Sequence, residues 1–271
     1  CIEACAEEAG DMQAWVYDEN GWPSGFAGGK LLENAEDRDR YLSHWVGSFD
    51  PTATVSYYID NGALVRTKVP MQGKTHLNVT VHSAASTADV LNPAVTDKFL
   101  KLTHETYKER FGAHFSEKIT GFFTDEPQYQ RWHTPYTTMV ADYFREHYGQ
   151  DIFDHIGLLF VEANGYRTFR YRHWSAMQQL LLNNFSKKVY DWCENNHIKL
   201  TGHYVEETSM GYQIMCCAGV MPFYEYEHIP GIDWLGVDTD HELSPRQVGS
   251  AACQLGKQQV ITETFGCCGW D

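Results

Sequence analysis

The chain has 271 residues, a mass of 31.1 kDa and a formal net charge of −15. This acidic balance excludes the basic face that nucleic-acid-binding proteins need, and an apolar content of 43% excludes wholesale disorder. No run approaches the length of apolar residues that a membrane span requires, so we expect no contact with a membrane. The sequence starts at Cys1 without a visible signal peptide, and we expect it to be part of a longer polypeptide.

Eight cysteines are present, and their spacing bears on the cellular compartment. They form no C-x-x-C pair and no compact framework of the kind that disulfides staple in small secreted proteins. We therefore interpret them as reduced, mostly buried thiols and expect the protein to be cytoplasmic. The eight are Cys1, Cys5, Cys193, Cys216, Cys217, Cys253, Cys267 and Cys268.

The first 90 residues contain a helix end, a strand and a β-rich stretch. Residues 1–9 are predicted to end a helix that Gly10 stops, and residues 14–18 form an apolar strand. Within residues 46–90, β-branched and aromatic residues alternate with polar ones, and Asn61-Gly62 occupies a turn position. This pattern predicts hairpins, and we interpret residues 46–90 as a β-rich insertion.

Helices and buried strands alternate through the rest of the chain. Three of the helices combine an N-cap residue, a following Pro and a terminal Gly. The helices are predicted over residues 92–112, 134–149, 168–195 and 244–256. The strands are predicted near residues 119–124, 200–205, 231–236 and 259–263. These strands are apolar runs without strict alternation, which is typical of a parallel sheet buried on both faces, so we expect an α/β architecture.

Acidic residues follow or end every one of the five predicted parallel strands. Because the carboxyl ends of parallel strands meet at one end of a sheet, these side chains should converge on one mouth. Such a cluster is electrostatically unfavourable unless it serves a function. In (β/α)8 barrels the active site lies at this mouth, so the pattern predicts that fold. The residues are Asp18, Glu19, Asp125, Glu126, Glu206, Glu207, Asp233 and Glu263.

Paired carboxylic acids at such a mouth suit glycoside hydrolysis. One carboxylic acid protonates the leaving oxygen, and a second carboxylate activates water or attacks the anomeric carbon. Four tryptophans near the strand ends offer flat rings on which sugars stack. They are Trp22, Trp132, Trp234 and Trp270.

Two short motifs resemble signatures of barrel glycosidases. Gly121-Phe-Phe-Thr-Asp-Glu-Pro127 is similar to their strand-four motif, in which Asn-Glu-Pro carries the acid glutamate. Thr262-Glu-Thr-Phe-Gly266 is similar to their strand-seven motif, which carries the second glutamate. In place of the motif's Asn this chain has Asp125, which when ionised cannot donate a hydrogen bond to a sugar hydroxyl.

Longer pieces of the chain resemble a bacterial group around glycoside hydrolase family 106, the α-L-rhamnosidases. The pieces are residues 15–29, 202–207, 229–236 and 263–271. The resemblance implies a TIM-barrel hydrolase whose strands three to seven lie in residues 1–271, with further polypeptide supplying the other strands. The fold class is then a partial (β/α)8 catalytic barrel, interrupted by the insertion at residues 46–90.

The same resemblance implies roles for two glutamates. Glu126 is expected to be the general acid, and the charge of Asp125 is expected to raise the pKa of Glu126 and keep it protonated near neutral pH. Glu263 is expected to be the general base if the enzyme inverts, as the rhamnosidase family implies. It is the nucleophile if the enzyme retains, as placement on strands four and seven suggests.

The mouth is expected to bind an oligosaccharide or glycoside. Glu206 and Glu207 are adjacent, so on a strand their side chains should diverge, and we expect Glu207 to point into the pocket. The side chains expected to contact substrate are Asp18, Glu19, Trp22, Asp125, His203, Glu206, Glu207, Asp233, Trp234 and Trp270.

Two alternatives stand beside this interpretation. A metal-dependent barrel hydrolase would use histidines near strand ends, but no H-x-H and no His pair at ligand spacing occurs. We therefore expect no cofactor and no catalytic metal, while an oxygen-rich mouth also suits Ca²⁺. The other alternative is a non-catalytic carbohydrate-binding or scaffold fragment, which an activity assay beside a binding measurement distinguishes. The histidines near strand ends are His82, His203, His228 and His241.

Overall fold

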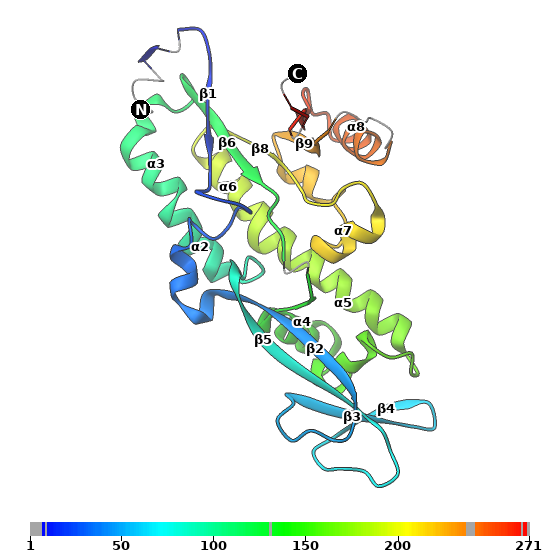
Figure 1. Ribbon diagram of the computed structural model, residues 1–271. Helices are drawn as coiled ribbons and strands as arrows, with labels where there is room; N and C mark the ends of the chain where they lie inside the picture. Colours follow the sequence, from blue (N-terminus) through cyan, green and yellow to red (C-terminus); the bar gives the residue numbers. More distant parts are fainter. Residues whose placement is uncertain (1–6, 9, 130–131, 237–241, 267, 270–271) are drawn as a thin grey trace.

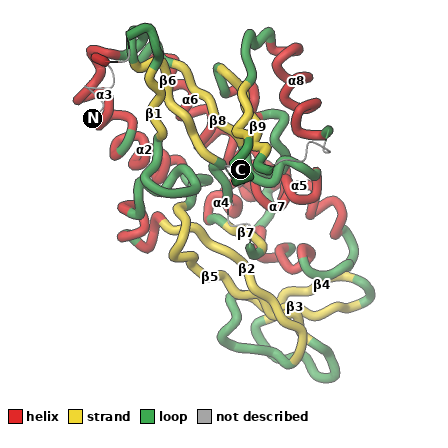
Figure 2. The backbone as a smooth tube through the Cα atoms, turned by 45° about the horizontal axis from the view of Figure 1, so that its top comes forward, coloured by secondary structure: helices red, strands yellow, loops and turns green. Residues whose placement is uncertain are grey.

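The computed structural model describes residues 7–8, 10–129, 132–236, 242–266 and 268–269. These residues form two five-stranded sheets, one parallel and one antiparallel, with helices packed beside them (Figure 1). The two sheets lie at opposite ends of the molecule (Figure 2). A continuous helical segment, residues 166–195, extends from beside the parallel sheet toward the antiparallel one. Within the described residues no helix is both long enough and apolar enough to cross a membrane.

The parallel sheet contains all five strands that the apolar runs predict. Every neighbouring pair runs parallel. Two glycines let the central strands approach closely: a Cβ on Gly202 would lie 2.1 Å from the backbone oxygen of Thr124, and one on Gly231 would lie 2.2 Å from the oxygen of Gly202. In sheet order the strands are β1 (Ala14–Tyr17), β6 (Ile119–Asp125), β8 (Lys199–His203), β9 (Ile229–Trp234) and β10 (Ile261–Thr264).

The predicted (β/α)8 barrel, with these strands as its third to seventh, is wrong for this chain. In the described residues the parallel sheet is an open half-barrel with edges at β1 and β10, and a second sheet holds as many strands. A closed barrel of this kind needs eight tilted, staggered strands. The prediction depended on acidic residues at strand ends and on the two glycosidase-like motifs. Strand carboxyl ends share one edge in any parallel sheet, so acidic residues there do not distinguish a barrel from an open sheet.

The antiparallel sheet is built around a long ribbon of two strands. In sheet order its strands are β4 (Ala63–Thr67), β3 (Val55–Asp60), β5 (His76–Ala88), β2 (Arg38–Gly47) and β7 (Thr134–Tyr136). β3 and β4 form a hairpin, and Asn61 and Gly62 at its turn have φ of 49° and 79°. The sheet includes β2 and β7, so it extends beyond residues 46–90. The division of the chain into a catalytic part and an insertion stays a prediction.

The α-helices are α2 (Pro93–Leu102), α3 (His104–Phe111), α4 (Thr138–Tyr148), α5 (Tyr166–Leu181), α6 (Lys187–Asn195), α7 (Met210–Cys216) and α8 (Leu243–Leu255). A π-helical turn, Leu182–Ser186, joins α5 to α6. Short 3₁₀ turns lie at Lys30–Glu33, Ala35–Asp37, Gly112–His114, Ile152–Asp154, Ile156–Leu159 and Phe223–Tyr226.

Several helix boundaries differ from the sequence-based expectation. The helix predicted over residues 92–112 is interrupted at Thr103, whose hydroxyl donates to the backbone oxygen of Phe99 at 2.8 Å. The short α7 was not predicted, because its exposed Met and Tyr side chains give no clear apolar stripe. The helix end expected before Gly10 lies largely outside the described residues.

The helix predicted over residues 134–149 begins later. Thr134-Pro135 lies in β7, paired with β2. Pro is tolerated there because β7 is an edge strand, where a missing N–H disrupts no ladder on the outer side. The helix α4 starts at Thr138, and the side chain of Thr137 caps it by accepting a backbone N–H of the first turn.

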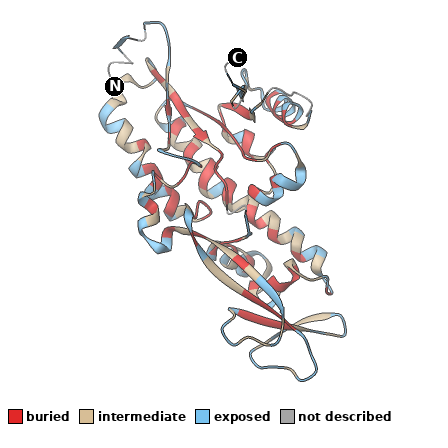
Figure 3. Cartoon of the chain, viewed as in Figure 1, coloured by how far each residue is buried: buried red, intermediate tan, exposed pale blue. Residues whose placement is uncertain are grey.

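The two faces of β6 lead to different environments. Phe122 is fully buried, and its ring lies 4.3 Å from that of His104 in α3 and 5.6 Å from that of Trp192 in α6. The next residue, Phe123, points the other way, where its ring stacks on Tyr17 and meets His203 edge-on. Buried residues gather where the sheet and the helices meet (Figure 3). The opposite face, at its carboxyl end, carries the acidic residues.

Candidate functional site

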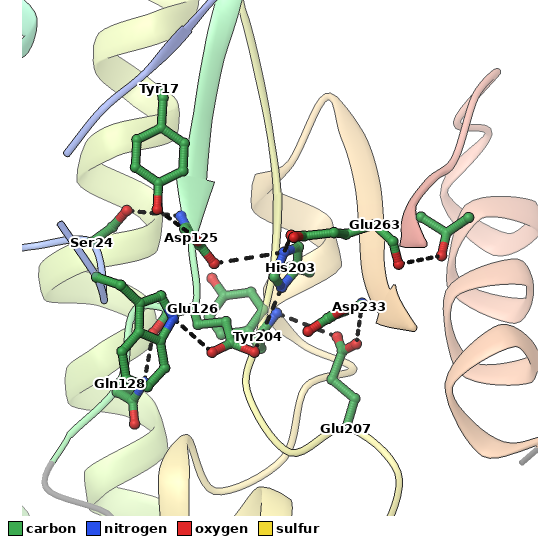
Figure 4. Close-up of polar contacts among 12 residues, drawn as sticks. Tyr17, Ser24, Asp125, Glu126, Gln128, His203, Tyr204, Glu207, Asp233 and Glu263 are labelled. Atoms are coloured by element: carbon green, nitrogen blue, oxygen red, sulfur yellow. Dashed lines mark hydrogen bonds and ion pairs between the residues drawn. The ribbon is translucent and has the colours of Figure 1, made fainter. Parts of the chain in front are cut away.

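A cavity of about 580 Å³ lies at the carboxyl ends of the parallel strands. The strand pairing sets the side chains opposite each other, since Asp125 is in register with His203 and Asp233 with Glu263. Figure 4 shows these side chains converging from β6, β8, β9 and β10. The lining residues are Trp22, Asp125, Glu126, His203, Tyr204, Val205, Glu206, Glu207, Thr208, Asp233, Trp234, Leu235 and Glu263.

His203 is the common neighbour of three acidic side chains. Its Nε2 lies 2.8 Å from Oε2 of Glu263 and 3.6 Å from Oδ1 of Asp125. Its Nδ1 lies 3.9 Å from Oε1 of Glu126, beyond hydrogen-bond distance. The His203 side chain is only 1% exposed. The buried imidazole therefore lies between Asp125, at the end of β6, and Glu263, in β10.

Glu126 occupies a constrained position immediately after β6. It is buried, and its backbone has φ of 48°, in the left-handed region that residues with a Cβ seldom adopt. Its backbone N–H donates to the oxygen of His203 at 3.1 Å, which ties this residue to the end of β8. The indole N–H of Trp22 donates to Oε2 of Glu126 at 2.9 Å. One hydrogen bond thus holds the backbone of Glu126, and another holds its carboxyl group.

Asp125 has partners on both sides. The Tyr17 hydroxyl donates to its Oδ2 at 2.5 Å, and its backbone N–H donates to the hydroxyl of Ser24 at 2.8 Å. Burial, followed by the contact with Asp125, raises the pKa of Tyr17, so the phenol stays protonated and remains a donor. Asp125, at the end of β6, thus accepts a hydrogen bond from another side chain of the protein.

Glu207 and Asp233 both line the cavity and are joined by a hydrogen bond. The Glu207 carboxyl accepts the backbone N–H of Asp233 at 3.0 Å and of Tyr204 at 3.3 Å, and the hydroxyl of Tyr224 at 3.3 Å. Burial raises the pKa of Glu207 to about 8. Burial, together with the charges of Glu263 and Asp125, raises the pKa of Asp233, and His203 opposes that shift.

The adjacent pair Glu206 and Glu207 does not lie on a strand. β8 ends at His203, and Glu206 has φ of 59°, so the alternation that should separate the two side chains no longer applies. Both residues line the cavity, and the Glu207 carboxyl turns to the protein interior. Their contact with substrate stays a prediction.

Asp18 and Glu19 lie in a different environment from the other acidic residues. Both line a second cavity of about 440 Å³, together with Tyr17, Lys30 and Arg110. The Ser24 hydroxyl donates to Asp18 at 2.6 Å, and burial raises the pKa of Asp18 to about 8. The structure therefore does not bring these two residues into the 580 Å³ cavity, and their role as substrate contacts stays a prediction.

The expected tryptophans divide in a similar way. Trp22 and Trp234 line the 580 Å³ cavity, whereas Trp132 is 74% exposed and does not. Trp270 lies outside the described residues. Sequence reasoning missed Tyr17 and Ser24 as partners of Asp125, although both lie at or near the end of a predicted strand.

Among the described residues, two groups of side chains could hold a metal ion, and both use His203. One is Asp125, His203 and Glu263, and the other is Glu126, His203 and Asp233; in each, the ligand atoms lie within 4.8 Å of one another. The other histidines considered for a metal site are elsewhere: His82 contacts Ser43, and His228 contacts Glu194. His241 lies outside the described residues.

Neither a protein-family profile nor a curated protein sequence matches the chain. Among solved structures, the chain is similar to a rhamnosidase from Novosphingobium sp. PP1Y, with a TM-score of 0.54 and 16% sequence identity. The match covers 74% of this chain and 21% of that one, so the chain spans about a fifth of the length of that structure. At this identity the likeness concerns the fold alone, which resembles part of a glycoside hydrolase.

Proposed function

We propose that the chain carries a glycoside hydrolase site of the α-L-rhamnosidase kind, in which Glu126 and Glu263 are the two catalytic carboxyl groups. One observation carries the proposal: the two glutamates, one directly after β6 and the other in β10, face the two nitrogens of one buried imidazole in a single cavity. Trp22 and Trp234 line the same cavity and offer rings to a sugar. The motifs that resemble family 106 and the fold of a solved rhamnosidase agree with this chemistry.

Burial separates the roles of the two carboxyl groups. Glu126 is only 7% exposed, and its carboxyl group is held by the indole N–H of Trp22. The side chain of Glu263 is 45% exposed, so a water molecule can reach its carboxylate. We assign Glu126 as the acid that protonates the leaving oxygen and Glu263 as the partner carboxylate.

The position of the imidazole favours inversion. Glu126 faces Nδ1 and Glu263 faces Nε2, so a ring separates the carboxyl groups. Inverting enzymes hold their carboxyl groups about 6.5–9.5 Å apart to admit a water, whereas retaining enzymes hold them about 5–5.5 Å apart. In the inverting case Glu263 takes a proton from the attacking water as the bond to the leaving oxygen breaks.

The test compares substrates with good and poor leaving groups. On an alkyl α-L-rhamnoside, Glu126→Gln should lose roughly 10²–10⁴-fold activity, and on a nitrophenyl α-L-rhamnoside far less, because the second needs little protonation. Glu263→Gln should abolish both activities. Glu146→Gln, on the exposed side of α4, is the matched control and should behave as the wild type.

Two outcomes would overturn the proposal. Equal losses with both substrates in Glu126→Gln, or near-native rates in Glu263→Gln, would refute the assigned roles. Rhamnoside binding by calorimetry without hydrolysis of any glycoside would support the non-catalytic alternative. Anomer detection by NMR in the first turnovers reports inversion or retention.

A further inference from the structure

The loop between β1 and the first 3₁₀ turn is organised around the side chain of Glu19. The carboxylate accepts the backbone N–H groups of four consecutive residues, at distances of 2.5–3.1 Å. It also accepts the N–H of Asn20 at 2.8 Å. The four consecutive residues are Gly25, Phe26, Ala27 and Gly28. Five N–H donors on one carboxylate fix the path of this loop, residues 19–28.

Ser24 fastens this loop to the end of β6. Its backbone N–H donates to the oxygen of Asp125 at 2.7 Å, and its hydroxyl accepts the N–H of Asp125 at 2.8 Å. The same hydroxyl donates to Asp18 at 2.6 Å. The loop is therefore joined by a reciprocal pair of hydrogen bonds to the residue that precedes Glu126. A displacement of the loop would therefore shift the backbone next to Glu126.

Trp22 lies in this fastened loop and reaches Glu126 directly. The indole N–H is a donor only, so it needs an acceptor, and it meets Oε2 of Glu126 at 2.9 Å. The other carboxyl oxygen, Oε1, is the one that faces Nδ1 of His203 at 3.9 Å. The two oxygens of the Glu126 carboxyl group are thus in different environments. The loop determines which of them accepts the indole N–H, because it carries Trp22.

We propose that Trp22 is a positioning residue for Glu126: its indole N–H occupies Oε2, so that Oε1 carries the acidic proton and delivers it to the leaving group. In a neutral carboxyl group only one oxygen bears hydrogen, and the oxygen that accepts an N–H is the carbonyl-like one. The inference rests on the proposed function. In the reaction, the Oε1 proton passes to the glycosidic oxygen as its bond to the anomeric carbon breaks, which leaves Glu126 ionised. Water supplies the new bond to that carbon and gives its proton to Glu263.

The first test removes the N–H and keeps an aromatic ring. Trp22→Phe should lower the hydrolysis of an alkyl rhamnoside roughly 10–100-fold and leave that of a nitrophenyl rhamnoside within about threefold, since the lost function is proton delivery. Trp45→Phe, in β2 of the antiparallel sheet, is the matched control and should leave both rates unchanged. Equal losses on both substrates would mean that Trp22 serves only structure or sugar stacking. No loss on either would also overturn the proposal.

A second measurement stands apart from catalysis. In ¹H–¹⁵N spectra of the ¹⁵N-labelled chain, the Trp22 indole N–H signal, assigned by its loss in Trp22→Phe, should move in Glu126→Ala and stay in place in Glu146→Ala. A signal that ignores Glu126 would refute the hydrogen bond and hence the proposal. If the signal responds but the wild type hydrolyses no glycoside, the contact stands, and the proposed function and the role that depends on it are refuted.

Discussion

The two acidic residues that follow β1 and the glutamate near the end of β10 lie at the carboxyl ends of parallel strands, but their surroundings are opposite. After β1, Glu19 is surrounded by backbone N–H groups, and Asp18 is 1% exposed beside Ser24. In β10, the Glu263 side chain is 45% exposed, with His203 as its neighbour at 2.8 Å. The sequence position is equivalent, but one end organises a loop and the other borders an open cavity.

The difference follows from what each connecting segment supplies. The loop after β1 carries glycines that bring consecutive N–H groups to a carboxylate, so Glu19 is satisfied without substrate. The segment after β10 presents no comparable set of donors to Glu263 in the described residues. A carboxylate at a parallel strand end is therefore a good candidate for chemistry only where the protein has not already satisfied its oxygens.

The largest effect expected from this contrast is on activity at the β10 end. Glu263→Gln removes the proposed catalytic carboxylate and keeps an amide that can still hydrogen-bond to His203, so hydrolysis of nitrophenyl α-L-rhamnoside should fall at least roughly 10²-fold. The free energy of unfolding in urea should change by less than about 0.5 kcal/mol, as at other exposed positions. A large loss of stability in this variant would show that the two strand ends are alike.

The opposite result is expected at the β1 end. Glu19→Ala leaves five N–H groups without their acceptor, and each such group that stays dry costs about 1–3 kcal/mol. Water reaches part of the loop, so we expect a total loss of about 2–4 kcal/mol in urea denaturation. Glu36→Ala, at an exposed carboxylate that pairs with Arg40, should cost less than about 1 kcal/mol. A loss of the same size in both variants would contradict the assigned role of Glu19.

Buried acids should also make stability depend on pH in an unusual direction. Burial raises the pKa of Asp18 from 3.8, and that of Glu207 from 4.5, to about 8 in each case. Between pH 4.5 and 8 the folded chain then holds protons that the unfolded chain has released, so stability falls as pH rises. The slope should approach about 1 kcal/mol per pH unit for each group.

Urea denaturation between pH 5 and 8 measures this slope. Asp18→Asn keeps the shape of the side chain and removes its charge, so the slope should flatten. Stability that rises with pH over this window would show that the buried acids are ionised in the folded chain.

How far the sequence predicts this structure depends on the range of the interactions. Period and composition located all five parallel strands, because burial on both faces leaves a continuous apolar run, as in Ile119–Asp125. Assignment of these strands to a partial (β/α)8 barrel was wrong, because no local pattern reports whether the edge strands of a sheet meet further strands. The hairpin at Asn61-Gly62 was predictable from turn chemistry alone.

The candidate site shows the same limit. Register brought Asp125, His203, Asp233 and Glu263 together as the strand ends implied. The loop after β1 turned Glu19 and Asp18 away, which depends on hydrogen bonds to residues 20–28 that no periodicity encodes. Trp22 and Glu126 are 104 residues apart in the sequence, so no local pattern predicts their contact.

The smallest expected effect is a rise in melting temperature on addition of calcium. We propose that acidic residues at the carboxyl ends of the parallel strands bind this ion. Asp125 and Glu263 supply oxygens of the kind Ca²⁺ prefers, beside His203, with ligand atoms within 4.8 Å of one another. Millimolar Ca²⁺ should raise the melting temperature by roughly 2–4 °C, which corresponds to about 1 kcal/mol of binding linkage, and chelation should reverse the rise. Glu263→Gln should abolish the shift and Asp18→Asn should preserve it. An equal shift in both variants would indicate non-specific binding to a chain of net charge −15, and would remove this distinction between the two strand ends.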